Sequence, residues 1–167
     1  VGDINNDGLN DLFFTANKAS NMLYINKGNL QFENISETSG ITGKSTWNTG
    51  VSMVDINQDG WLDIYVCSVV GIHGFKGHNE LYINQKDGTF KESASDYGLA
   101  IQNYSTSAAF FDFDKDGDLD LYLLNHGVHK TSTYGVNINR KESNEMSSDK
   151  LFENREGKFV DVTALAN

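Results

Sequence analysis

Three short windows of the chain concentrate the side chains that are best able to bind a ligand. They read Asp3-Ile-Asn-Asn-Asp-Gly-Leu-Asn-Asp11, Asp55-Ile-Asn-Gln-Asp-Gly-Trp-Leu-Asp63 and Asp112-Phe-Asp-Lys-Asp-Gly-Asp-Leu-Asp120. These nine-residue windows hold 11 of the 23 acidic residues in the 167-residue chain. Carboxylates packed this closely repel one another, so the clustering indicates that they share a cation. Plain, solvated acidic turns are the alternative.

The order of residues in each window suits a cation loop built from oxygen ligands. Side-chain oxygens at positions 1, 3, 5 and 9 can converge on one ion, position 7 can add its backbone carbonyl, and glycine at position 6 permits the sharp turn. Ca²⁺ tolerates such irregular, high coordination better than Mg²⁺ does, so we predict three Ca²⁺ sites. The ligands would be the side chains of Asp3, Asn5, Asp7 and Asp11 with the carbonyl of Leu9, those of Asp55, Asn57, Asp59 and Asp63 with the carbonyl of Trp61, and those of Asp112, Asp114, Asp116 and Asp120 with the carbonyl of Asp118.

These windows differ from EF-hand loops. The twelfth position, where an EF-hand needs a bidentate Glu, holds Phe14, Val66 and Leu123. Strands rather than helices are expected on both sides, so each loop should connect a β-hairpin. An ion that binds the folded state alone stabilises that state, so we expect a structural role for it. Without the bidentate Glu the sites should be weak and fill best at extracellular calcium levels of about millimolar.

The windows belong to a longer repeat, and they begin 52 and 57 residues apart. Short apolar segments rich in Val, Ile, Tyr and Phe alternate with Gly, Asn and Asp turns, and no segment shows a sustained helical period. Four strands in a unit of about 50 residues are typical of a β-propeller blade. We predict an all-β fold, a propeller of four-stranded blades with about three blades present, in repeat units of about 1–46, 47–103 and 104–167. Equivalent aromatics should pack blade against blade: Tyr24, Tyr82 and Phe152, and Phe32, Phe90 and Phe159.

Composition excludes several classes of function. The formal net charge is −10, which argues against an electrostatic binder of nucleic acid. No apolar run approaches the about 20 residues of a membrane span. Cys67 is the only cysteine, so an intrachain disulfide and a zinc site with two cysteine ligands are excluded.

The repeat resembles the FG-GAP/VCBS repeat family of integrin-α-type propellers, and within it the bacterial ASPIC/UnbV-like and the cartilage-acidic-protein-like members. The matching segments are the three windows, Asn21-Met-Leu-Tyr-Ile-Asn26 with Leu30-Gln-Phe32, and Asn79-Glu-Leu-Tyr-Ile-Asn84 with Gly88-Thr-Phe90. The third unit departs from the pattern with Asp149-Lys-Leu-Phe-Glu-Asn154, and the literal FG-GAP tetrapeptide is absent, so an integrin-like ligand face does not follow. The resemblance implies a Ca²⁺-dependent propeller, usually of seven blades, outside the cytoplasm, but no single activity.

Three blades cannot close a ring, so we expect the remainder of a larger propeller or complex to complete this one. A signal peptide or lipid anchor would then lie outside this sequence. The connection before the Leu-Tyr or Leu-Phe strand varies in length, which places insertions at 67–78 and 125–148 on one face. Such loops commonly carry binding. They contain His73, His78, His126 and His129; a transition-metal or catalytic role for them is the alternative to plain exposed histidines.

Three functions remain open. The leading hypothesis is a binding or scaffold module for protein or glycan, extracellular, at the cell surface or in the periplasm, which includes an outer-membrane lipoprotein. The rival is part of a polysaccharide hydrolase or lyase with its site in the two insertions; this needs a carboxylate pair, and no spacing marks Glu80, Glu142, Glu145 and Asp149 as one. A structural spacer is the third. We favour a protein without catalytic activity and assign no catalytic residue.

Overall fold

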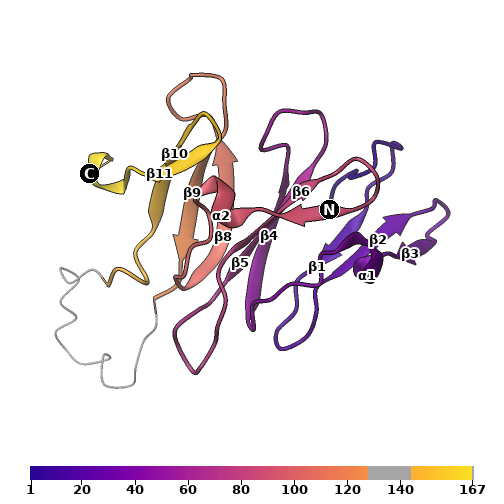
Figure 1. Ribbon diagram of the computed structural model, residues 1–167, viewed down its shortest axis with the longest axis horizontal. Coiled ribbons are helices and arrows are strands. Elements are labelled where there is room, and N and C mark those ends of the chain that lie inside the picture. Colours follow the sequence, from indigo (N-terminus) through magenta and orange to yellow (C-terminus); the bar gives the residue numbers. More distant parts are fainter. Residues whose placement is uncertain (128–143, 167) are drawn as a thin grey trace.

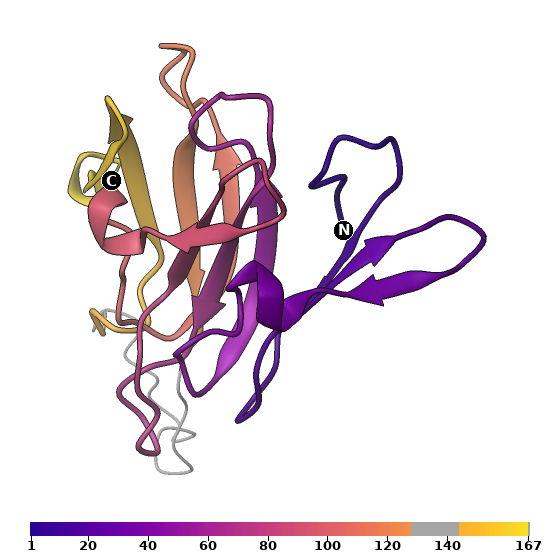
Figure 2. The same cartoon turned by 45° about the vertical axis from the view of Figure 1, so that its right-hand side comes forward.

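The computed structural model describes residues 1–127 and 144–166, and within them the chain folds into three antiparallel sheets (Figure 1). The all-β prediction is therefore confirmed. The sheets follow one another in chain order and are called sheets one, two and three. Sheet two lies between the other two in both views (Figures 1 and 2). The two flanking sheets each bury apolar residues against sheet two.

Each sheet is a simple antiparallel meander. Sheet one contains β1 (Leu12–Phe14), β2 (Met22–Asn26) and β3 (Phe32–Asn34). Sheet two contains β4 (Asn48–Val54), β5 (Asp63–Ser68), β6 (Glu80–Asn84) and β7 (Phe90–Glu92). Sheet three contains β8 (Ser105–Phe111), β9 (Asp120–Asn125), β10 (Lys150–Arg155) and β11 (Lys158–Asp161).

The acidic windows close the hairpins that open sheets two and three. Val54 pairs with Asp63 across one window, and Phe111 pairs with Asp120 across another. The strand before a window therefore pairs forward, with the strand that follows the window. For this reason β4 joins sheet two, and sheet one has three described strands rather than the four expected of a unit.

Single helical turns follow the last strand of each sheet. They are α1 (Ser36–Ser39), α2 (Ala94–Tyr97) and the 3-10 turn η2 (Thr163–Leu165). Gly40 and Gly98 end the first two in the left-handed conformation, with φ of 80° and 79°, which glycine adopts without steric cost. Four residues are too few to give the helical period that sequence patterns reveal.

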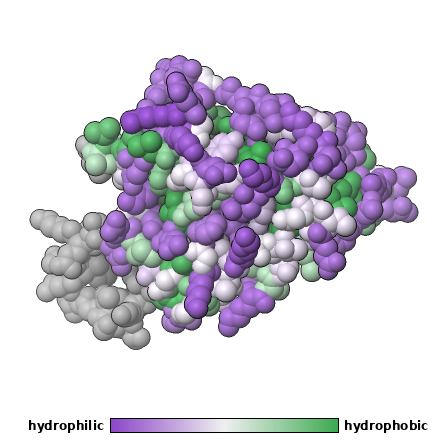
Figure 3. Space-filling model, viewed as in Figure 1, coloured by the Kyte–Doolittle hydropathy of each residue, from purple (hydrophilic) through white to green (hydrophobic). Residues whose placement is uncertain are grey.

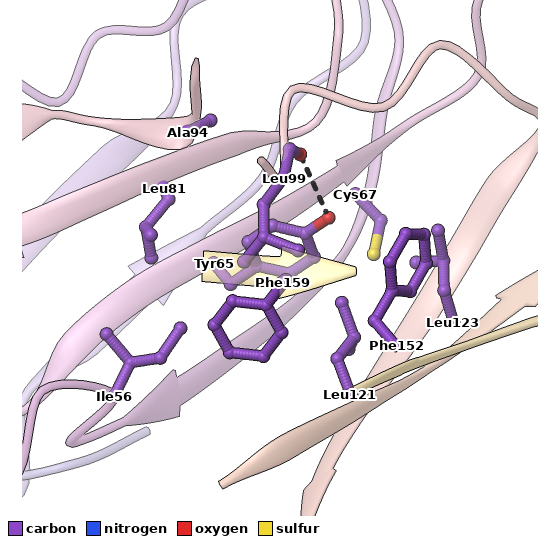
Figure 4. Packing of buried hydrophobic residues seen from close by; sticks show 10 residues of the cluster. All are labelled: Ile56, Tyr65, Cys67, Leu81, Ala94, Leu99, Leu121, Leu123, Phe152 and Phe159. Atoms are coloured by element: carbon purple, nitrogen blue, oxygen red, sulfur yellow. Dashed lines mark hydrogen bonds between the residues drawn. The ribbon is translucent and has the colours of Figure 1, made fainter. Parts of the chain in front are cut away.

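Strand β5 forms the centre of the structure because both of its faces are buried. Successive side chains of a strand point to opposite faces, so Ile64 and Val66 pack toward sheet one while Tyr65 and Cys67 pack toward sheet three. The second of these cores is drawn in Figure 4, where the Tyr65 hydroxyl donates a hydrogen bond of 3.3 Å to the Leu99 carbonyl. Its buried members are Ile56, Tyr65, Cys67, Leu81, Ala94, Leu99, Leu121, Leu123, Phe152 and Phe159.

Four of the six aromatic residues expected between blades are buried between the described sheets. Tyr82 and Phe90 belong to the core of sheets one and two, and Phe152 and Phe159 to the core of sheets two and three. Tyr24 and Phe32 differ, because they point to the outer face of sheet one and line an apolar groove with Phe14. No other described sheet packs on that face.

Glycine allows β4 and β8 to approach each other closely at the contact between sheets two and three. A Cβ atom on Gly50 would overlap the backbone carbonyl oxygen of Thr106. Two hydroxyl groups of β4 bond across the same contact: Thr49 donates to the Ser105 carbonyl at 2.7 Å and Ser52 to the Ala108 carbonyl at 2.6 Å. The sheets therefore meet backbone to backbone at this point.

We expect Gly50→Val to separate β4 from β8 and to lower the free energy of unfolding by about 1–3 kcal/mol, the usual cost of overpacking. The measurement is thermal unfolding followed by circular dichroism. Lys91→Val is the control, because it places the same side chain on an exposed strand position. An unchanged melting temperature for Gly50→Val would contradict the close approach.

Candidate metal centre

The three acidic windows lie together at one edge of the sheets. They form the upper loops in Figure 1, and hydrophilic residues dominate the same edge of the surface in Figure 3. This follows from the repeat, because each window joins equivalent strand ends. Three chemically similar loops therefore share one edge, while their connecting strands run away from it.

Each loop is wound around its own acidic side chains. The position-1 carboxylate accepts the backbone N–H of position 6, as Asp3 does from Gly8 at 2.8 Å and Asp55 from Gly60 at 2.8 Å. The position-5 carboxylate accepts the N–H of position 7, as Asp7 does from Leu9 at 2.9 Å. The glycine at position 6 has a positive φ in each loop, of 87° at Gly8, 86° at Gly60 and 99° at Gly117. The loop conformation thus turns the carboxylates inward.

In the third loop, carboxylate oxygen atoms converge. One carboxylate oxygen each from Asp112, Asp114 and Asp116 lies within 4.8 Å of the other two. The Asp118 Oδ1 atom is buried and has no hydrogen-bond partner among the described residues. A buried acceptor without a donor is costly, and a cation would satisfy it. The donor set and this orphaned oxygen fit a hard cation.

Like charges are concentrated in this loop. Desolvation first, and then the negative charges of neighbouring aspartates, raise the pKa of the Asp114 carboxyl, and the same two causes raise the pKa of Asp118. Loops one and two carry Asn at position 3, and its amide donates to the position-5 carboxylate: Asn5 to Asp7 at 3.0 Å and Asn57 to Asp59 at 3.2 Å. Loop three has aspartate at position 3, so its carboxylates lack this internal hydrogen bond from an amide.

The position-9 aspartates are buried and have a second role that spacing did not reveal. Asp11, Asp63 and Asp120 have no exposed surface. In Asp63, one oxygen accepts the N–H of Ile56 in the loop at 3.2 Å, and the other accepts the N–H of Asn84 on β6 at 2.8 Å. Burial raises the pKa of the Asp63 carboxyl to about 6, despite these hydrogen bonds. Asp11 and Asp120 make the equivalent pairs of bonds.

This buried carboxylate fixes its loop to the sheet and still leaves lone pairs for a cation, since each oxygen can accept twice. The ligands predicted at positions 7 and 9 are thus placed differently. The position-7 carbonyls of Leu9, Trp61 and Asp118 accept no hydrogen bond from the described residues, whereas the position-9 carboxylates are already bonded twice.

Sequence reasoning missed the asparagines that complete each loop anchor. Asn26, Asn84 and Asn154 end the equivalent strands β2, β6 and β10 or lie close to their ends. Each side-chain amide donates to the position-8 carbonyl of its loop, at 3.0 Å, 3.1 Å and 3.2 Å respectively. Their recurrence at equivalent positions of the three units is the signal in the sequence that marks them.

Neighbouring loops are also joined to each other through position 4. The Asn6 amide donates to the Gly60 carbonyl at 3.1 Å, and the Gln58 amide donates to the Gly117 carbonyl at 2.6 Å. In addition, Lys86 of the β6–β7 turn lies 3.2 Å from the Asp59 carboxylate. The Lys86 ammonium group therefore already lies beside Asp59, one of the predicted ligands of loop two.

The histidines of the insertions do not converge in the described structure. The Nδ1 atom of His78 lies 2.7 Å from the Asn79 carbonyl, and His73 packs edge-on against Phe75 at 6.0 Å. His126 donates its backbone N–H to Tyr104 at 2.7 Å. His129 and Glu142 lie outside the described residues, as does most of the 125–148 insertion.

Two carboxylates outside the loops, those of Glu80 and Asp149, are held by structural hydrogen bonds. Glu80 is buried and accepts from the Lys44 N–H at 2.6 Å and from the Tyr82 hydroxyl at 2.7 Å. Asp149 lines an open groove of 710 Å³ with Glu145 and accepts from Tyr122 and Asn125 at 2.8 Å each. These contacts leave Asp149 and Glu80 poorly suited to act as a catalytic pair.

In the part of the chain that the structure describes, no helix has the length and apolar character needed to cross a membrane.

Comparisons with known proteins agree with the repeat. A family model of the FG-GAP-like repeat matches residues 3–66 and 69–123. Cartilage acidic protein 1 of Xenopus tropicalis is 28% identical over 131 residues, which cover 75% of this chain and 19% of that protein. The Mus musculus and Homo sapiens proteins of the same name are 26% and 24% identical over 136 residues, covering 79% of this chain and 20% and 19% of theirs. The chain thus spans about a fifth of these relatives.

We expect Asn84→Ala to lower the free energy of unfolding by about 2–3 kcal/mol, because it leaves buried partners without hydrogen bonds. The lost bonds run from the amide to the Ile4 carbonyl at 2.8 Å and to the Leu62 carbonyl. Urea denaturation measures the change, and the exposed neighbour Gln85→Ala is the control. Equal stability of the two variants would show that the anchor is dispensable.

Proposed function

The chain belongs to the FG-GAP-like repeat family, and from this premise we propose that it is part of a calcium-stabilised β-propeller that acts outside the cytoplasm as a binding or scaffold module. Each of the three sheets would form all or part of one blade, and further repeats would complete a ring. Its partners would be proteins or glycans. The periplasm and the surface of a cell, with or without a lipid anchor, are the compartments that fit this proposal.

The observation that carries the calcium proposal is the convergence of oxygen atoms in the third loop, together with the orphaned Asp118 Oδ1 of the same loop. Asp112, Asp114 and Asp116 would hold the ion there, as Asp3, Asn5 and Asp7 would in loop one and Asp55, Asn57 and Asp59 in loop two. The position-7 carbonyls and position-9 carboxylates would complete the coordination. A bound Ca²⁺ supplies positive charge that offsets carboxylate repulsion.

The ions would also stabilise the contacts between neighbouring acidic loops. Loop two bonds to loop one through Asn6 and to loop three through Gln58, so ordering one loop fixes an acceptor for its neighbour. Three Ca²⁺ ions would offset six of the ten net negative charges of the chain. The acidity of the chain is then mainly a ligand set.

A location outside the cytoplasm is supported by the strength expected of such sites. Loops without a bidentate Glu fall in the range that extracellular modules use, with dissociation constants of about 0.1–1 mM. The similarity to proteins named for cartilage points the same way. A polysaccharide-cleaving function has no comparable support, because the described insertion residues bring no free carboxylate pair together.

We expect 1 mM Ca²⁺ to raise the melting temperature and EDTA to lower it. With a dissociation constant of about 0.1 mM, each loop would gain about 1.4 kcal/mol of stability from the ion. Differential scanning calorimetry measures the shift. A variant with Asp7, Asp59 and Asp116 each changed to Asn keeps an acceptor for the position-7 N–H and should lose the calcium-dependent shift. Identical curves of the wild-type chain in calcium and in EDTA would refute the proposal.

We expect Lys86→Gln to raise the calcium affinity of loop two by about two- to fivefold, which is the range of an exposed ion pair. The ammonium group at 3.2 Å from Asp59 competes with an incoming cation. Trp61 occupies position 7 of this loop, so Tb³⁺ emission excited through the indole and displaced by Ca²⁺ reports the site.

Lys91→Gln is the matched control for this titration, since Lys91 pairs with Asp96 rather than with a loop carboxylate. A Lys86→Gln chain that binds calcium no more tightly than the control would show that the ion pair does not compete.

A further inference from the structure

Three exposed lysines without an ion pair among the described residues gather at the edge opposite the acidic loops. Lys27, Lys86, Lys91, Lys150 and Arg155 each pair with a carboxylate. Lys18, Lys44 and Lys76 are exposed and form no ion pair with any described residue. Lys115, inside the third acidic loop, and Lys158, which donates to the Asp96 carbonyl, also have no ion pair with a described residue but belong to other segments. In a chain with a net charge of −10, unpaired positive charge gathered in one place is unexpected.

The three lysines come from different connections that lie side by side. Lys18 lies between β1 and β2, Lys44 between α1 and β4, and Lys76 between β5 and β6, all at the lower edge in Figures 1 and 2. Thr46 joins them, because its carbonyl accepts the Lys18 N–H at 3.0 Å and its own N–H donates to the Lys76 carbonyl at 3.0 Å. Both lysine segments are therefore hydrogen-bonded to the same residue.

Two of these lysines line an open groove of 460 Å³, which we call the lysine groove. Its lining consists of Lys18, Ala19, Ser20, Thr42, Gly43, Lys44, Ser45 and Thr46. Lys76 borders it through Thr46, and no acidic side chain lines it. The surface of the groove is thus composed of ammonium groups, hydroxyl groups and backbone.

Buried contacts fix the shape of the lysine groove. Beneath the groove, the Glu80 carboxylate accepts the backbone N–H of Lys44 at 2.6 Å and that of Ser45 at 3.2 Å. The Ser45 hydroxyl donates to the His78 carbonyl at 2.6 Å. Trp47 stacks on Phe75 with ring centroids 4.5 Å apart, which holds the segment of Lys76 against that of Thr46. A groove held in this way loses little freedom when a ligand binds.

The nearby negative charges are too few to cancel the lysines. Glu80 lies beneath the groove, and Glu37 lines an adjoining groove that shares Ser20 and Thr42. The acidic loops lie at the far end of β4, whose seven residues span about 23 Å. This exceeds the Debye length of about 8 Å at physiological ionic strength. The lysine groove therefore keeps a local positive field.

We propose that the lysine groove binds an acidic polysaccharide, whose sulfate or carboxylate groups meet Lys18, Lys44 and Lys76 and whose hydroxyls meet Ser20 and Thr42. This assignment names a partner for the binding module proposed above and rests on that function. The lining favours a glycan over an acidic peptide, because it offers no aromatic or large aliphatic anchor of the kind that protein interfaces use. Nucleic acid is disfavoured by the acidic loops elsewhere on the same small chain.

The test measures binding of the chain, in 1 mM Ca²⁺ and 0.15 M NaCl, to a heparin oligosaccharide and to oligogalacturonate, which carry sulfate and carboxylate groups respectively. Neutral dextran and poly-glutamate serve as comparison ligands. We expect one or both acidic glycans to bind, the affinity to fall as salt rises, and the Lys18→Gln, Lys44→Gln, Lys76→Gln triple variant to bind at least tenfold more weakly.

The matched control carries Lys27→Gln, Lys91→Gln and Lys158→Gln, which removes the same charge from other parts of the surface. It should change affinity less than twofold. An equal loss in the control, an absence of binding to both acidic glycans, or tighter binding to poly-glutamate would each overturn the proposal. The single variants Lys18→Gln and Lys76→Gln provide the answer if the triple variant does not fold.

Failure of this proposal can be separated from failure of the calcium proposal. The melting shift between Ca²⁺ and EDTA depends on the acidic loops and should be the same in the wild-type chain and in the triple lysine variant. A chain that shows the calcium shift without glycan binding refutes the lysine groove alone. A chain that binds the glycans without the calcium shift refutes the calcium sites alone.

Discussion

The structure depends on a buried aspartate at the end of each acidic window. Asp63 accepts one backbone N–H from its own loop and another from β6, and it is fully buried at the base of the loop. A carboxylate in this position is costly to desolvate, and the two hydrogen bonds and the partner asparagine offset the cost. The same residue begins strand β5, so it connects the loop, the hairpin and the sheet in one place.

This anchor explains why the two edges of the sheets can differ so strongly. At one edge the anchors hold clusters of carboxylates close together, in loops that bond to one another through Asn6 and Gln58. At the other edge the connections vary in length, and there the chain gathers unpaired lysines and hydroxyl groups. The strands between them separate the two sets by more than a Debye length, so each edge keeps its own electrostatic character.

Much of the loop design could be read from local sequence. The glycines at position 6 have the positive φ that the turn requires, and Asp3 and Asp7 turn inward as expected. The short apolar segments of the repeat correspond to strands, whereas the burial of both faces of β5 depends on the sheets around it. The helical turns α1 and α2 were not, because four residues carry no period, and the exposed positions of Tyr24 and Phe32 depend on which sheets surround them.

The sequence by itself determined the repeat, the all-β fold and the clusters of oxygen-bearing side chains, because all three rest on spacings within a few residues and on strand alternation. Only the tertiary structure decided which residues meet across units. The hydrogen bond from Asn84 to Asp63, the asparagine that completes each anchor, the contact of Lys86 with Asp59 and the links of Thr46 to Lys18 and Lys76 join segments at least 16 residues apart. Such contacts arise from the register and stacking of sheets, which no local pattern specifies.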